Sequence, residues 1–319
     1  MVRTGSAGCP TATPPAPVGH SGVDMYLAVR DWVEQRLWRH GWWVANPTVG
    51  SPDHRIRRYR LPEPIGELSV GSEKRHFVVP TEKVTTPYGF SFARRGWHPY
   101  IACLDEHEQS GALGYDHSVL REFHERFAPE SLYDAVSSSR DESATKGRES
   151  SPHSWPLLRD LWLLDEGAAR RYAKEAHTLP PEQRSPHAGP FNVEAGRSTF
   201  ARLIRVAESI REHGYHPARF DRDRIMGFDG YGADGYFLWD GEDFRFVLLH
   251  GHHRVSAAAF HGIEILFLSI RRRYVPVVAQ DALHDDTIAS WLETEERLGV
   301  FDAMFSADGL SKARTLGLA

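Results

Sequence analysis

The sequence predicts an α+β protein, with a small sheet packed by helices in the C-terminal half and a separate α+β region before it. Apolar residues recur at helical spacing near 25–40, 200–213 and 285–319, whereas short strand-like runs gather at 54–92 and 224–270. Hydrophobic residues make up 41% of the 319 residues, which is enough for a packed core.

Composition and charge exclude several functional classes. The formal net charge of −5 argues against a protein whose whole surface grips nucleic acid. Cys9 and Cys103 have neither a metal-ligand spacing nor a disulfide framework, which indicates a reducing cytoplasm. No apolar stretch approaches the roughly 20 residues that cross a bilayer, and the N-terminus lacks the apolar core of a signal peptide. We therefore expect a cytoplasmic protein without a membrane partner.

Changes in composition divide the chain. A Gly/Pro/Ser/Thr-rich start and a polar SSSRDESATKGRESSP stretch are typical of disordered or linking segments. The expected units are a disordered tail (1–22), an N-terminal α+β domain of unknown type (23–136), a linker or mobile loop (137–152), a connecting segment (153–188), a second α+β domain (189–280) and C-terminal helices (281–319).

The first half of the chain predicts one helix over 25–40, strands within 54–92, and a further helix near 119. Asp116 is placed to cap that helix, and Pro129 to close it.

The second half of the chain has the most regular pattern. Ser198 or Thr199 is placed to cap a helix over 200–213, and Gly214 to end it. Three short strands are expected next, with GADG and GED as turns between them, so Asp229, Asp234 and Asp240 are all assigned to turns. The expected strands lie at 224–230, 236–240, 244–250 and 263–270, with a helix at 254–261 before the last.

The junction between the third strand and that helix, Gly251 to Arg254, predicts an anion site. The first amides of a helix lack partners in the preceding turn, and the helix dipole adds partial positive charge there. Gly251 leaves room for a ligand, Arg254 offers a planar fork for phosphate oxygens, and His252 and His253 can donate hydrogen bonds. The residues alone leave two alternatives: a tight turn, or a metal site made by these histidines with His250.

The order of these parts resembles the ParB/sulfiredoxin superfamily over about 189–275. A helix ending SIREHG, a strand reading FVLL, the GHHR turn and an Ala-rich helix that ends at a glycine carry the resemblance. In that superfamily the domain binds ATP or CTP with Mg²⁺, and the motif's His and Arg touch phosphates. Residue by residue, Gly251 matches the motif glycine, His253 the sulfiredoxin histidine and Arg254 the final arginine.

The departures from that pattern matter as well. His252 stands where sulfiredoxins have their catalytic cysteine, so we expect no sulfinic-acid reduction. No helix-turn-helix follows the motif, so no specific DNA binding is expected. Glu194 and Arg197 precede the expected helix, where relatives contact the nucleotide: the resemblance implies a second phosphate contact for Arg197, and a Mg²⁺ ligand or a catalytic base for Glu194. The alternative is a salt pair in a solvated loop.

The sequence therefore predicts a nucleotide-binding protein with ATP or CTP and Mg²⁺ as cofactors, acting as a phosphotransferase on a small-molecule acceptor or as a nucleotide-dependent switch. One alternative is a non-catalytic interaction or regulatory protein whose protein partner binds the N-terminal domain. A third is a metal-dependent hydrolase or nuclease that uses the histidines. Whether the protein is an enzyme stays open.

Overall fold

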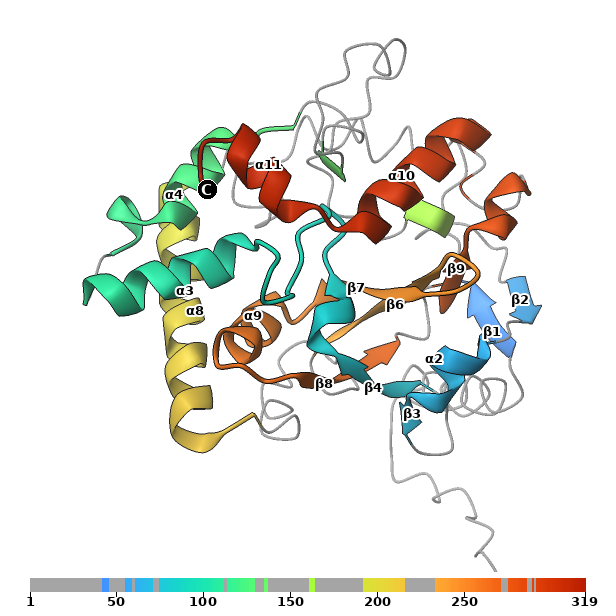
Figure 1. Ribbon diagram of the computed structural model, residues 1–319, viewed down its shortest axis with the longest axis horizontal. Helices are drawn as coiled ribbons and strands as arrows, with labels where there is room; N and C mark the ends of the chain where they lie inside the picture. The colour runs from blue at the N-terminus through green and yellow to red at the C-terminus, as the bar shows by residue number, and fades with distance from the viewer. Residues whose placement is uncertain are drawn as a thin grey trace, which may run out of the picture.

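The computed structural model describes residues 42–45, 55–58, 61–70, 75–111, 114–129, 135–136, 161–163, 192–215, 233–270, 275–285, 289 and 291–319. These residues form an α+β fold with a seven-stranded mixed open sheet packed with helices, which confirms the predicted α+β class (Figure 1). The predicted tail at 1–22, helix at 25–40, linker at 137–152 and strand at 224–230 lie outside the described residues.

The described elements are these. The strands are β1 (Trp42–Ala45), β2 (Arg55–Arg58), β3 (Ser69–Val70), β4 (His76–Pro80), β5 (Val84–Thr85), β6 (Asp234–Trp239), β7 (Phe244–His250), β8 (Ile265–Ile270) and β9 (Val277–Ala279). The α-helices are α2 (Glu63–Glu67), α3 (Pro99–Ser110), α4 (Val119–Arg126), α8 (Val193–His213), α9 (His252–Phe260), α10 (Thr294–Ser306) and α11 (Gly309–Thr315). The short 3-10 helices are η1 (Thr81–Lys83), η2 (Tyr115–His117), η3 (Leu161–Leu163) and η7 (Asp281–His284).

The sheet joins strands that are far apart in sequence. Its order is β3-β4-β8-β6-β7-β5, and β9 also pairs with β6. β4 runs antiparallel to β8, and β5 runs parallel to β7. Strands from 69–85 and from 234–279 therefore share one sheet, although the sequence pattern predicts two different domains for these segments. β1 and β2 form a separate antiparallel pair.

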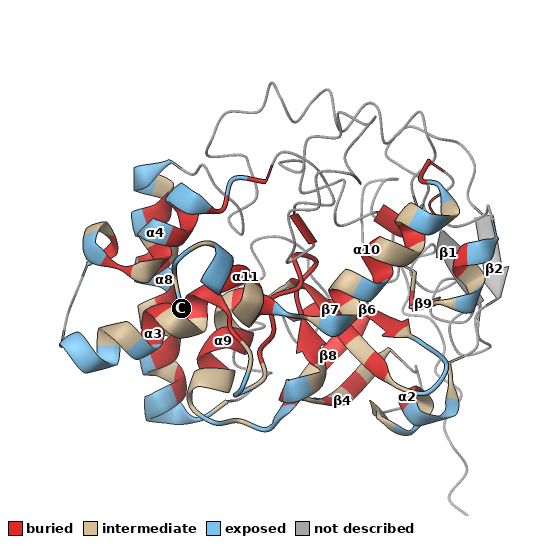
Figure 2. Ribbon diagram, turned by 45° about the horizontal axis from the view of Figure 1, so that its top comes forward, coloured by how far each residue is buried: buried red, intermediate tan, exposed pale blue. Residues whose placement is uncertain are grey.

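Helices α3, α8 and α9 pack together beside the sheet, and α9 contacts both of the others (Figure 1). The buried face of α8 contains Phe200, Leu203, Ala207 and Ile210, as its helical spacing predicts. Figure 2 shows that these helices and the central strands turn their buried positions toward one another. The His261 ring is 2.9 Å from the Ala207 carbonyl, which fixes the end of α9 against the middle of α8.

Two helix starts differ from the prediction because other side chains form the caps. The Asn192 side chain accepts hydrogen bonds from the amides of Glu194 and Ala195, so α8 begins at Val193 and Ser198 lies inside it. Ser118, and not Asp116, caps α4 by accepting from the Arg121 amide.

Of the C-terminal helices predicted over 281–319, the structure has α10 at Thr294–Ser306 and α11 at Gly309–Thr315. Lys312 anchors α11: its Nζ donates to the carbonyls of Tyr88 (2.6 Å) and Ala135 (2.7 Å) and lies 5.1 Å from the centre of the Phe90 ring. Burial lowers the pKa of this lysine to about 7. The helix thus ties three separate segments of the chain together.

Among the described residues, no helix combines the length and the apolar character that crossing a membrane requires.

Candidate functional site

The predicted junction has the expected backbone geometry. β7 ends at His250, Gly251 adopts a left-handed conformation with φ 90° and ψ 15°, and α9 begins at His252, two residues earlier than predicted. A side chain would strain this conformation, which explains the glycine. The Gly251 carbonyl accepts from the amides of Arg254 and Val255, each at 3.0 Å. The start of α9, with its partial positive charge, therefore lies at one end of the sheet.

Two motif histidines pack inward. His252 is 3% exposed, and its ring centre is 6.5 Å from that of His98, the residue that caps α3. His253 packs 4.9 Å from the Tyr100 ring. Burial, with neighbouring charge as a lesser cause, lowers the pKa of His98 and of His253 to about 3, and it lowers that of His252 well below its usual value. These rings are neutral at pH 7 and join α9 to α3.

Positive charge at the start of α9 comes from arginines instead. Arg254 is half-buried and lies close enough to Tyr215 that its charge opposes the rise of that phenol's pKa, which burial brings to about 12. Arg202 is exposed on α8. Burial lowers the pKa of His253 and raises that of Tyr100, and the charge of Arg202 lowers both pKa values. Arg202 is a site residue that sequence reasoning missed, because only the packing of α8 on α9 brings it there.

A second missed feature is a hydrogen-bonded pair at the same end of the sheet. The His250 Nδ1 lies 2.9 Å from the Asp234 Oδ1, and Asp234 is 5% exposed. The assignment of Asp234 to a turn is therefore wrong, because this residue is the first of β6. Asp240, by contrast, does form the predicted turn, since its Oδ1 accepts from the amides of Glu242 and Asp243.

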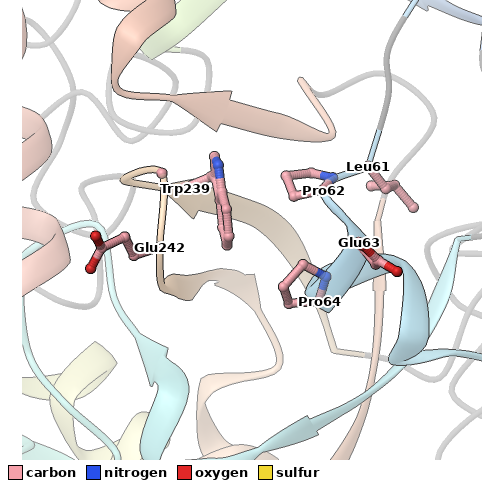
Figure 3. A pocket seen from close by; sticks show the side chains of 7 residues that line it. Leu61, Pro62, Glu63, Pro64, Trp239 and Glu242 are labelled. Carbon is pink, nitrogen blue, oxygen red and sulfur yellow. The ribbon is translucent and has the colours of Figure 1, made fainter.

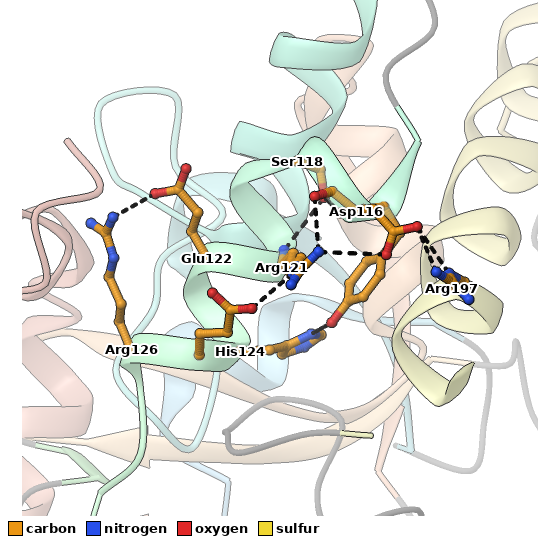
Figure 4. Close-up of polar contacts among 9 residues, drawn as sticks. Asp116, Ser118, Arg121, Glu122, His124, Arg126 and Arg197 are labelled. Atoms are coloured by element: carbon orange, nitrogen blue, oxygen red, sulfur yellow. Dashed lines mark hydrogen bonds and ion pairs between the residues drawn. The ribbon is translucent and has the colours of Figure 1, made fainter. Parts of the chain in front are cut away.

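The other two predicted residues lie on α8, not on a loop before it. Arg197 donates from Nη2 (2.7 Å) and Nε (3.1 Å) to the Asp116 carboxylate, and its side chain is 56% exposed (Figure 4). Glu194 is exposed in the first turn of α8. The His253 ring donates a hydrogen bond to the Thr199 carbonyl. Glu194 and Arg197 precede Thr199, so both lie in the part of α8 that extends beyond the start of α9.

Neither a metal cluster nor the cavity of Figure 3 coincides with this junction. In the part of the chain that the structure describes, no three His, Cys, Asp or Glu side chains are grouped to hold a metal ion. The cavity has a volume of about 770 Å³ and is lined by Trp239, Pro62 and Pro64, with Glu63 and Glu242 beside it (Figure 3). Trp239 ends β6 and Asp234 begins it, so the cavity and the junction lie at opposite ends of that strand.

His98 is separated by more than 150 residues from the motif it packs against, and no local pattern indicates that contact. Comparisons of the chain with protein-family models, with curated proteins and with solved structures found no match.

Proposed function

We propose that the protein binds the phosphates of a nucleotide, ATP or CTP, at the start of α9. The observation that carries this proposal is the left-handed Gly251 between β7 and α9, with Arg254 in the first helical turn. A helix N-terminus that follows a strand and a glycine offers amides and partial positive charge to an anion. The same order of strand, glycine, basic residue and small-residue helix supports a ParB/sulfiredoxin-like domain over about 189–275.

The side chains around the junction suggest distinct roles. Arg254 gives the phosphates a bidentate partner, and Arg202 adds positive charge from α8. His252 and His253 are buried or half-buried and neutral, so we assign them to holding the helix start in place. Gly251 keeps the approach to the amides clear. Arg197 and Glu194 lie further along α8, and Arg197 would have to leave Asp116 to reach a phosphate.

The described residues near the junction suggest how Mg²⁺ would bind. They include no group of three metal ligands, and the Asp234 carboxylate near the junction already bonds His250. Mg²⁺ commonly keeps most of its waters and binds through substrate phosphates. We therefore propose that Mg²⁺ would arrive with the nucleotide, held mainly by its phosphate oxygens and water.

The proposal covers a nucleotide-dependent switch and a phosphotransferase with a small-molecule acceptor. The alternative, an interaction protein without nucleotide, is favoured by one observation, the Trp239 cavity with its two proline rings (Figure 3). Aromatic and proline side chains are well suited to contact a partner's apolar groups. A Trp239→Ala variant distinguishes partner binding at the cavity from nucleotide binding at α9, because it alters that cavity and leaves the junction intact.

The test is calorimetric titration with ATP, CTP, GTP and UTP, with and without Mg²⁺. We expect one nucleotide to bind and Arg254→Ala to lose about 1.5–3 kcal/mol, or about tenfold to more than a hundredfold in affinity, because a charged phosphate contact is removed. Arg314→Ala is the matched control, since Arg314 is an exposed arginine on α11. Absence of binding at millimolar nucleotide, or equal affinity in both variants, would contradict the proposal.

A further inference from the structure

The cavity beside Trp239 is built at the regular end of β6. At its start, β6 lies opposite a β-bulge of β7 in which Leu249 is the extra residue. At its end, Trp239 pairs with Phe244 on one side and with Ala279 on the other, and its carbonyl accepts from the Gln280 amide at 2.8 Å. The strand end that carries the indole is thus held by both neighbouring strands.

The opposite wall of the cavity comes from the start of α2. Figure 3 shows the Trp239 ring on one side of the cavity and the rings of Pro62 and Pro64 on the other. Because proline has a fixed φ, this wall is formed before a ligand arrives, and binding requires little further ordering. The volume of about 770 Å³ lies within the range of small-molecule sites.

The charged residues that line the cavity, among those described, are both acidic. Glu242 follows β6, and Glu63 lies on α2. Lys83 and Arg245 bond the neighbouring Asp243 carboxylate instead, each at 2.7 Å. In the part of the chain that the structure describes, no basic side chain pairs with Glu63 or Glu242. A cation in the cavity would therefore be attracted by two carboxylates whose charge no described side chain neutralises.

The indole of Trp239 also favours a cation. The residue is half-buried, and no aromatic or basic side chain of the described segments stacks on its ring. Of the aromatic side chains, an indole attracts ammonium and guanidinium groups most strongly. The two glutamates would repel a phosphate, so the chemistry of this cavity is opposite to that of the junction at α9.

We propose that this cavity binds a small organic cation, an ammonium or guanidinium group carried on an apolar chain. The cationic group lies over the Trp239 indole, with Glu63 and Glu242 as its negative neighbours, and the apolar chain packs on the two proline rings. The site is separate from the one proposed at α9, since Trp239 and Asp234 mark opposite ends of β6. Binding of the cation therefore does not depend on a nucleotide.

The first test compares two compounds that share a shape and differ in charge, n-butylguanidinium and the neutral n-butylurea. The chain has nine tryptophans, so 5-fluorotryptophan labelling and ¹⁹F NMR are used, and Trp239→Phe assigns the resonance at the cavity. We expect n-butylguanidinium to shift that resonance with an affinity about tenfold or more above that of n-butylurea, because it adds cation–π and charge attraction. Equal affinity for the two compounds, or no shift with either, would overturn the proposal.

The second test separates a built site from the general attraction of an acidic protein. Glu63→Gln and Glu242→Gln should each weaken n-butylguanidinium binding about two- to fivefold. Glu67→Gln is the matched control, since Glu67 is an exposed residue of α2 that does not line the cavity. An equal loss in the control would overturn the proposal. Binding of an arginine-containing peptide without binding of n-butylguanidinium would also overturn it, because the occupant would then be a partner chain.

Discussion

Gly235 leaves no space for a side chain, which makes it the most restrictive single position near the junction. Gly235→Ala would push a methyl group into the Val247 carbonyl, so we expect the free energy of unfolding to fall by about 1–3 kcal/mol or more. Urea denaturation followed by circular dichroism measures it. Gly66→Ala is the matched control, because a Cβ there meets no atom within 4 Å. If both variants lost the same stability, the close approach of β6 to β7 would be in doubt.

Some residues near the junction could be predicted from the sequence, and others could not. The GADG stretch has the composition of a turn, and Asp234 was assigned to one, because a bulge has no sequence signature of its own. Gly251 and Arg254 were predictable because strand, glycine and helix follow one another directly. Arg202 and His98 were not, since each reaches the junction only through the packing of α8 or α3.

At the scale of elements, the contact between α3 and α9 should be sensitive to acid. His98, His252 and His253 have lowered pKa values in the folded protein, mainly through burial. Below pH about 6.5 the unfolded chain therefore binds more protons than the folded one. For His98 and His253 this difference persists down to pH about 3, so the free energy of unfolding falls as the pH falls through that window. Each such histidine contributes about 1.4 kcal/mol per pH unit. Urea midpoints at pH 7.5, 6.5 and 5.5 measure the slope.

A substitution of His98 can test the contribution of this residue to the pH dependence while it keeps the N-cap of α3. His98 Nδ1 accepts from the Tyr100 amide, and Asn is also a good N-cap residue. His98→Asn should therefore reduce the dependence of stability on pH by about the contribution of one histidine, while α3 still forms. An unchanged slope in this variant would mean that His98 is not neutral in the folded state.

Elements whose signal is local agree with the prediction most closely. The expected strand 244–250 coincides with β7, and the expected helix 254–261 with α9 to within two residues. The sequence predicts that α8 begins at residue 200, because Ser198 and Thr199 are themselves good caps, but Asn192 supplies the cap and the helix begins seven residues earlier, at Val193. Helix α2 replaces part of an expected strand, because Pro64 suits the first turn of a helix and Pro62 directly precedes it.

At the scale of the whole molecule, the shared sheet predicts that the C-terminal half does not fold alone. A fragment of residues 186–319 lacks β4 and β5, so the edges of β8 and β7 lose their partners. It also lacks the carbonyls of Tyr88 and Ala135 that hold Lys312. We expect this fragment to aggregate or remain unfolded in size-exclusion chromatography and circular dichroism.

The matching control is co-expression with residues 1–185. If the sheet is the reason, the two fragments should purify together with native-like circular dichroism. A 186–319 fragment that is monomeric and cooperatively folded would contradict the prediction. The pairing of β4 with β8 spans more than 180 residues, which is why no pattern within either half could indicate it.

The bulge at Leu249 also has a consequence for how this sequence could change. Leu249 is the extra residue of β7 between Leu248, which pairs with Gly235, and His250, which pairs with Asp234. Deletion of this one residue would restore an even strand in which His250 follows Leu248 directly and still lies opposite Asp234. The bulge therefore lets β7 contain one more residue than β6 at this point without separating the imidazole from the carboxylate.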